Sequence, residues 1–180
     1  YATPDYYLEF RYENDLAQKR AIDVVREAGQ EFGERFGRDY SALIESYRME
    51  DAETAIVAMG SICGTTKDAI DEMRSEGKKV GLVRIRCFRP FPAEDLRAAL
   101  GHVSRIAVLD KNVSLGAGGT TARGAVGLEV RDALYGSSIP VLDYIIALGG
   151  RDVRIDDIKD VVAACEAGDG DRFFGLRTEV

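Results

Sequence analysis

Two glycine-containing segments follow apolar runs, at points where a strand would pass into a helix. They are residues 60–64, with the sequence GSICG, and residues 116–121, with the sequence GAGGTT. Backbone N–H groups at the start of a helix bind anions. The second segment is not a dinucleotide loop, since Thr121 stands where the third glycine belongs, and it is not a P-loop. We therefore weigh anion binding against a tight turn, with these candidate contacts: Ser61, Gly116, Gly118 and Gly119.

Nucleophilic catalysis is a second chemistry to consider, because Cys63 lies near the start of an expected helix, where the helix dipole lowers the pKa of a thiol. A cysteine nucleophile needs a base within reach. The single histidine, His102, has no sequence relation to Cys63, and Ser61 is explained more simply as a helix N-cap. We predict no catalytic residue, no cofactor-binding residue and no metal ligand in this chain.

Residues 86–92, with the sequence RCFRPFP, combine arginines and phenylalanines on a backbone that two prolines restrict. Arginine pairs with carboxylates or phosphates through two parallel hydrogen bonds. Arginine and aromatic side chains are also typical anchors of protein interfaces. We therefore predict interface or anion contacts at four positions: Arg86, Phe88, Arg89 and Phe91.

Four apolar runs alternate with helical patterns and predict the fold. The expected strands are residues 55–59, 80–85, 106–109 and 141–147, and the expected helices begin near residues 62, 93, 122 and 156. This alternation predicts a three-layer α/β/α fold with a mainly parallel sheet. Asp110 and Asn112 follow the third expected strand, at the edge where such folds bind ligands. They are candidate contacts, although Asp110 is equally suited to cap a turn.

The N-terminal residues have a different composition. Residues 1–12 contain five aromatic side chains, residues 15–36 form a predicted helix with one apolar stripe, and residues 40–47 are a second short helix or a connection. We predict an aromatic arm and linker helix from a missing upstream domain over residues 1–50. An α/β domain over residues 51–168 and a tail over residues 169–180 follow. The start at Tyr1, without an initiator methionine, suggests a processed or truncated chain.

The composition restricts the function classes. A net charge of −7 argues against a nucleic-acid partner, which needs clustered lysine and arginine. No apolar run reaches the roughly 18–20 residues of a membrane span. The three cysteines are far apart and form no Cys-x-x-Cys pair, so we predict neither a zinc site nor an iron–sulfur site here, and a cytoplasmic location.

Four blocks in a fixed order resemble a known family. They are residues 47–53 leading into AIVAMGS, residues 81–92 (GLVRIRCFRPFP), residues 107–119 (AVLDKNVSLGAGG) and residues 147–152 (ALGGRD). Through these blocks the chain resembles the C-terminal half of the α subunit of pyruvate:ferredoxin oxidoreductase, or pyruvate synthase, within the 2-oxoacid:acceptor oxidoreductases. The resemblance runs from the N-terminal helix to about Cys165.

The resemblance implies a fold like the C-terminal domain of transketolase, with a sheet of commonly five strands, one of them antiparallel. It implies an enzyme that converts pyruvate, CoA and oxidised ferredoxin to acetyl-CoA, CO2 and reduced ferredoxin. The implied cofactors are thiamine diphosphate, Mg2+ and iron–sulfur clusters, which in the family lie largely in other domains or subunits. This chain is then a structural and assembly domain that is inactive alone.

The implied partners are the N-terminal domain of the same α subunit, the β, γ and δ subunits or their fused equivalents, and ferredoxin. One departure concerns residues 120–124, with the sequence TTARG, where the family continues with a bulky aliphatic–aromatic pair. This departure leaves the preferred 2-oxoacid open. Two alternatives also stay open. One is the equivalent domain of a transketolase or 2-oxoacid dehydrogenase E1 component, and the other is a free-standing anion-binding α/β module.

Overall fold

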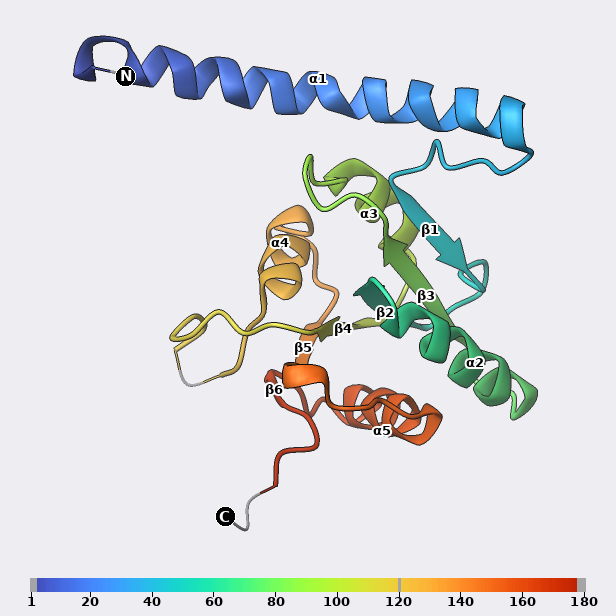
Figure 1. Ribbon diagram of the computed structural model, residues 1–180. Coiled ribbons are helices and arrows are strands. Elements are labelled where there is room, and N and C mark those ends of the chain that lie inside the picture. Colours follow the sequence, from blue (N-terminus) through green and yellow to red (C-terminus); the bar gives the residue numbers. More distant parts are fainter. Residues whose placement is uncertain (1–2, 120, 178–180) are drawn as a thin grey trace. The chain divides into compact units, whose positions relative to one another are not determined.

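Six strands form one sheet in the computed structural model, which describes residues 3–119 and 121–177 (Figure 1). The strand order is β1-β3-β2-β4-β5-β6. The strand β1 is antiparallel to β3, and the other neighbours are parallel. The strands are β1 (Ile44–Tyr47), β2 (Thr54–Met59), β3 (Val80–Ile85), β4 (Arg105–Asp110), β5 (Val141–Ile145) and β6 (Arg172–Phe173).

Helices cover both faces of this sheet and give the three-layer α/β/α fold that the sequence predicts. The helices α2 (Ile62–Ser75) and α5 (Ile155–Glu166) pack together on one face. The helices α3 (Ala93–Leu100) and α4 (Ala125–Ala133) pack together on the other face (Figure 1). A 3-10 turn, η1 (Leu148–Gly150), precedes α5, and the N-terminal helix α1 spans Pro4–Phe36.

The core explains why the central strands are nearly continuous apolar runs. Every residue of β2 except Met59 is buried, because helices cover both faces of the strand. Helix α2 buries a stripe of residues at the three- and four-residue spacing of a helix, namely Ile62, Thr66, Ile70 and Met73. Among the described residues, no helix is long and apolar enough to cross a membrane.

The chain forms two compact units, which we describe separately. The first contains Tyr1–Leu43 and Arg86–Pro92, and the second contains the sheet with its four helices. In the first unit, the buried residue of α1 is Gly29. A Cβ atom there would clash with the backbone of Ser41, so glycine allows the segment after the helix to pass close to it. Several large apolar side chains of α1 are exposed, namely Tyr6, Tyr7, Leu8, Phe10, Tyr12, Val24 and Phe36.

Several boundaries differ from the sequence-based expectations. The predicted arm is helical from Pro4 onwards, because α1 is continuous. Residues 44–47 form β1 and not a short helix, residues 172–173 extend the sheet as β6, and α4 begins at Ala125 instead of about residue 122. The first compact unit comprises Tyr1–Leu43 and Arg86–Pro92, and the predicted domain bounds at residues 50 and 168 stay a prediction. The parts of the predicted arm, loop and tail at residues 1–2, 120 and 178–180 lie outside the described residues.

Burial in the sheet can be tested with a matched pair of leucines. Leu82 in β3 has 0% exposure and Leu115 has 87%. We expect Leu82→Ala to lower the free energy of unfolding by about 2–5 kcal/mol, because it removes buried contacts and leaves a cavity. Leu115→Ala should change it by less than about 0.5 kcal/mol. Chemical denaturation followed by circular dichroism measures both, and equal losses would contradict the placement of Leu82.

Candidate functional site

The N-terminus of α4 rests on side chains that β4 and β5 carry to the carboxyl edge of the sheet. Asp110 is the last residue of β4, and Asp143 is the third residue of β5. Val108 pairs with Asp143, so Asp110 lies two positions further along its strand and points to the same face. Both aspartates have 0% exposure. The sheet therefore places two carboxyl groups in the interior beneath one helix end.

These side chains accept hydrogen bonds from the first turn of the helix. Asp143 Oδ2 accepts from the Gly124 N–H at 2.8 Å, and Asp110 Oδ2 accepts from the Gly127 N–H at 2.9 Å. Asn112 Oδ1 accepts from the Ala125 N–H at 2.9 Å, while its Nδ2 donates to Asp110 Oδ1 at 2.7 Å. The first N–H groups of a helix lack partners within it. The side chains of Asp110, Asn112 and Asp143 thus replace the capping side chain that Gly124 lacks.

The two glycines are required by the same contacts. A Cβ atom on Gly124 would overlap the carboxyl group of Asp110, and a Cβ atom on Gly127 would overlap that of Asp143. Each glycine therefore donates its N–H to one aspartate and makes room for the other. The spacing of three residues places both glycines on one side of the helix.

Burial changes the acidity of this pair. Burial raises the pKa of Asp110, and the backbone N–H of Gly127 partly opposes that rise. The pKa of Asp143 is raised further, to about 6, first by burial and then by the nearby Asp110, against the N–H of Gly124. The other oxygen of Asp143, Oδ1, is buried and has no hydrogen-bond partner among the described residues.

A third aspartate, Asp171, joins β5, α4 and the loop before it. Its carboxylate forms ion pairs with Arg123, at 3.0 Å, and with Arg131. It also accepts a hydrogen bond from the backbone N–H of Asp143 at 2.9 Å, and its carbonyl accepts one from Ala122 at 2.7 Å. We call Asp110, Asp143 and Asp171, together with Arg123 and Arg131, the carboxylate cluster.

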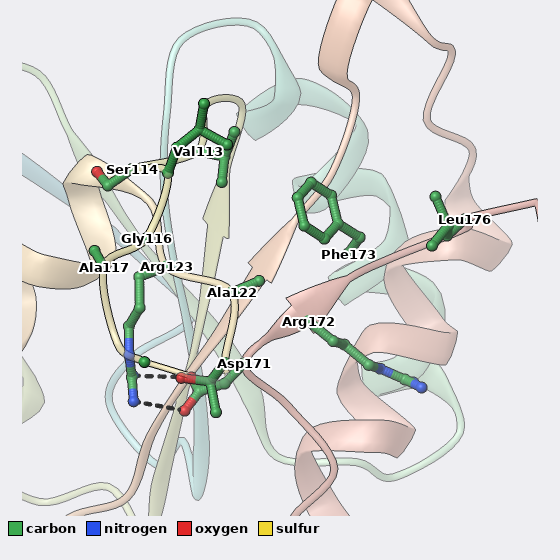
Figure 2. Close-up of a pocket in the computed structure, with 13 residues that line it drawn as sticks. Val113, Ser114, Gly116, Ala117, Ala122, Arg123, Asp171, Arg172, Phe173 and Leu176 are labelled. Carbon is green, nitrogen blue, oxygen red and sulfur yellow. Dashed lines mark hydrogen bonds and ion pairs between the residues drawn. The ribbon is translucent and has the colours of Figure 1, made fainter.

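A pocket of about 430 Å3 opens beside this cluster, over the glycine-containing loop (Figure 2). We call it the loop pocket. Val113, Ala117, Ala122 and Phe173 give it apolar walls, and the Arg123–Asp171 ion pair lies at one end (Figure 2). Its remaining lining residues are Ser114, Leu115, Gly116, Gly119, Thr121, Arg172 and Leu176.

Two of the three glycines predicted as anion contacts in this loop line the loop pocket. Gly116 and Gly119 line the loop pocket, and Gly118 does not. All three have positive φ angles, of 78°, 69° and 78° respectively, which are the backbone conformations of tight turns. The nearest guanidinium groups are already paired, Arg123 with Asp171 and Arg172 with Asp169. The geometry therefore fits the tight turn, and anion binding at these glycines stays a prediction.

Asp110 and Asn112 lie at the carboxyl end of β4, and both accept hydrogen bonds from the start of α4. Their role as interface or anion contacts stays a prediction. Ser61 follows β2 at the same edge of the sheet, is exposed, and makes no side-chain cap hydrogen bond to α2. Burial raises the pKa of the Cys63 thiol, so the helix start does not activate it. His102 bonds through Nε2 to the Met49 carbonyl at 2.8 Å.

The arginine–phenylalanine corner lies in the other compact unit. Phe88 and Phe91 meet edge to face with ring centres 5.9 Å apart, and the Arg89 guanidinium lies 4.4 Å from the centre of the Phe88 ring. Arg86 lies over the ring of Tyr40 at 5.3 Å, and its backbone N–H donates to the Leu43 carbonyl. These contacts order the corner on residues 40–43, and its role as an interface anchor stays a prediction.

Of the carboxylate cluster, the sequence indicated only Asp110, and the other four members were missed. Asp143 sits inside the apolar run 141–147, and an aspartate in a buried strand is itself a signal, because a buried charge needs partners. Asp171, Arg123 and Arg131 carried no such signal. Their charges are ordinary in loops and on helix surfaces, so their contacts appear only in the folded chain.

The interlocking of glycines and carboxyl groups gives a sharp test. Gly124→Ala and Gly127→Ala should each lower the free energy of unfolding by about 1–3 kcal/mol, because the new methyl group displaces a buried carboxyl group. Gly64→Ala in α2 is the control, since a Cβ atom there meets nothing within 4 Å. It should raise stability by up to about 1 kcal/mol through helix propensity. Thermal denaturation compares the variants, and a gain at Gly124 or Gly127 would contradict the packing.

Comparison with known proteins gives matches over most of the chain. The family model described as pyruvate:ferredoxin oxidoreductase core domain II matches residues 52–158. The pyruvate synthase subunit PorA of Methanocaldococcus jannaschii is 47% identical over 169 residues, which cover 93% of this chain and 42% of that protein. The ketoisovalerate oxidoreductase subunit VorA of Pyrococcus horikoshii is 46% identical over 162 residues, which cover 89% of this chain and 40% of that protein. The chain therefore spans about two fifths of the length of these relatives.

Solved structures share the fold. A 2-oxoglutarate:ferredoxin oxidoreductase from Magnetococcus marinus aligns with a TM-score of 0.55 and 23% identity, over 69% of this chain and 20% of that chain. A split-gene transketolase, an inactive β4 tetramer, aligns with a TM-score of 0.51 and 18% identity, over 69% and 42% of the two chains. The transketolase-like fold is thereby confirmed. By its family match and its relatives, the chain belongs to the pyruvate:ferredoxin oxidoreductase core domain II family, as the resemblance indicates.

Proposed function

We propose that this chain is the structural and assembly domain of a 2-oxoacid:ferredoxin oxidoreductase α subunit. The observation that carries the proposal is that two buried aspartates, Asp110 and Asp143, bind the start of a helix. Asp110 and Asp143 lie at the carboxyl edge, where active-site groups gather in such folds, and both accept hydrogen bonds from the backbone of α4. These hydrogen bonds hold the start of α4 in place, which is a structural use of the two acids. The family match is the reason for assigning the chain to this class of parent enzyme.

The parent reaction that we propose converts pyruvate, CoA and oxidised ferredoxin to acetyl-CoA, CO2 and reduced ferredoxin. Ketoisovalerate is the second candidate substrate, because a relative named for it is 46% identical, close to the 47% of the pyruvate synthase relative. We set aside a transketolase or dehydrogenase E1 component, since that likeness, at 18% identity, supports the fold alone.

Thiamine diphosphate, Mg2+ and iron–sulfur clusters belong to the proposed parent enzyme. Within residues 3–119 and 121–177, no group of three or more His, Cys, Asp or Glu side chains is placed to hold a metal ion. In the proposal, these groups lie in other domains or subunits of the parent enzyme. The free thiols of Cys63, Cys87 and Cys165 support a reducing, cytoplasmic location.

We propose that α1 connects the sheet domain to a further domain of the α subunit, and that α1 packs against this further domain. Both relatives are named as subunits, which supports an assembly with partner chains. The first turns of α1 expose Tyr6, Tyr7, Leu8, Phe10 and Tyr12, at 55–74% of each residue's surface. Exposed apolar side chains in such a group mark contact surfaces. The further partners in the proposal are the β, γ and δ subunits or fused equivalents, and ferredoxin.

An activity assay tests whether the chain is inactive without the other parts of the enzyme. We expect the purified chain to show no pyruvate-dependent reduction of ferredoxin with added thiamine diphosphate, Mg2+ and CoA, because in the proposal the cofactor sites lie in other domains or subunits. The complete enzyme, assayed in parallel with pyruvate and with ketoisovalerate, is the positive control and ranks the two substrates. Turnover by the chain alone would overturn the proposal.

The docking of α1 is tested in the assembled enzyme. Tyr6→Ser combined with Phe10→Ser should reduce the yield of assembled complex by about tenfold, because it removes apolar contact area. Glu9→Ser on the same turns is the matched control and should assemble normally. Size-exclusion chromatography measures assembly, and circular dichroism of the α chain checks its folding. Normal assembly of the double variant would contradict the proposed contact.

A further inference from the structure

Asp143 has an unusual environment for a carboxyl group. Its Oδ2 accepts a hydrogen bond from the Gly124 N–H, while its Oδ1 is buried and has no partner among the described residues. A buried ionised carboxylate is costly unless its oxygens are hydrogen-bonded or paired with a cation. The geometry therefore favours the uncharged acid at this position.

The charges that face Asp143 come from every element around it. Asp110 faces it from β4, Arg131 from α4 and Asp171 from the segment before β6. Asp171 itself binds the guanidinium groups of both Arg123 and Arg131. The two guanidinium groups thus pair with Asp171, and Asp110 opposes the ionisation of Asp143 more strongly than Arg131 favours it.

The same residue is linked to the wall of the loop pocket. The backbone N–H of Asp143 donates to Asp171, and the carbonyl of Asp171 accepts from Ala122 in that wall. Across the base of the loop, the Ser114 N–H donates to the Arg123 carbonyl at 2.7 Å. A change at Asp143 therefore has a short, bonded route to the residues that line the pocket.

We propose that Asp143 is a protonation-dependent latch. The uncharged acid holds the first turn of α4 and the adjoining wall of the loop pocket in place, and its ionisation loosens both.

The direction of the pH dependence follows from proton binding. In the closed state, burial and Asp110 raise the pKa of Asp143 to about 6. In an opened state that exposes the side chain to water, the pKa returns to about 4. The closed state binds the proton more tightly, so its advantage is complete below about pH 4 and is lost as the pH rises through the closed-state pKa. Linkage then predicts that the opening constant rises about tenfold between about pH 5 and about pH 8.

Amide hydrogen exchange followed by NMR tests the latch in the folded chain. After correction for the intrinsic pH dependence of exchange, the protection of the Gly124 and Gly127 amides should fall about tenfold from about pH 5 to about pH 8. The Ser114 amide should follow the same profile if the latch reaches the pocket. Protection that is independent of pH, or a profile absent at Ser114, would overturn the proposal.

Two variants separate the latch from general effects of charge. Asp143→Asn is uncharged at every pH, so the protection of its Gly124 amide should lose most of its fall between about pH 5 and about pH 8. Any fall that remains comes from Asp110, whose pKa is also raised by burial. Asp132→Asn removes an exposed acid from the same helix and should keep the profile of the parent chain. An unchanged profile in Asp143→Asn would refute the assignment.

An NMR titration of Asp143 in the unsubstituted chain tests the latch without any variant, in case Asp143→Asn does not fold. The carboxyl carbon of Asp143 in the unsubstituted chain should titrate with a midpoint near 6, as burial and Asp110 require. A midpoint at the ordinary value of about 4 would show that ionisation has no cost here, and would overturn the latch.

Discussion

The structure depends on a compromise at the start of α4. The helix needs acceptors for its first N–H groups, and the sheet supplies them as Asp110 and Asp143 from its interior. Burying two carboxyl groups is costly, and the hydrogen bonds of the helix offset that cost. The need for close approach then fixes glycine at 124 and 127. The order of the loop before α4 follows, because its residues bond to the same cluster.

The strands of the sheet could be predicted where burial on both faces requires apolar residues at nearly every position. The central strands are covered on both faces and therefore appear as unbroken apolar runs, as in β2 and β4. The edge strand β1 could not be predicted in this way. In its sequence, IESY, Ile44, Glu45 and Tyr47 are half-buried and Ser46 is exposed, so no apolar alternation marks a strand. Its antiparallel pairing with β3 is a long-range contact. The strand β6 has two residues and is too short to show any periodicity.

The candidate site was only partly predictable, for a similar reason. Asp110 and Asn112 follow an apolar run, and chain order places them at the carboxyl edge. Their partners, Gly124 and Gly127, are nearby in sequence, yet nothing local indicates that carboxyl groups will lie against their Cα atoms. Asp171 is separated from Asp143 by α5, so only the return of the chain to β5 brings the two together. The sequence therefore indicated the site residues at the end of β4 and missed Asp143 on β5, although it predicted both strands.

The exposed side chains of α1 have a practical consequence for work on the separate chain. A helix of 33 residues is about 50 Å long, and its first turns carry five large apolar side chains in contact with solvent. Such surfaces attract one another in concentrated solution. Light scattering on this chain would then report a size that grows with concentration. That size would reflect non-specific association through the apolar surface of α1. The stoichiometry of the native enzyme therefore has to be measured with its natural partners present.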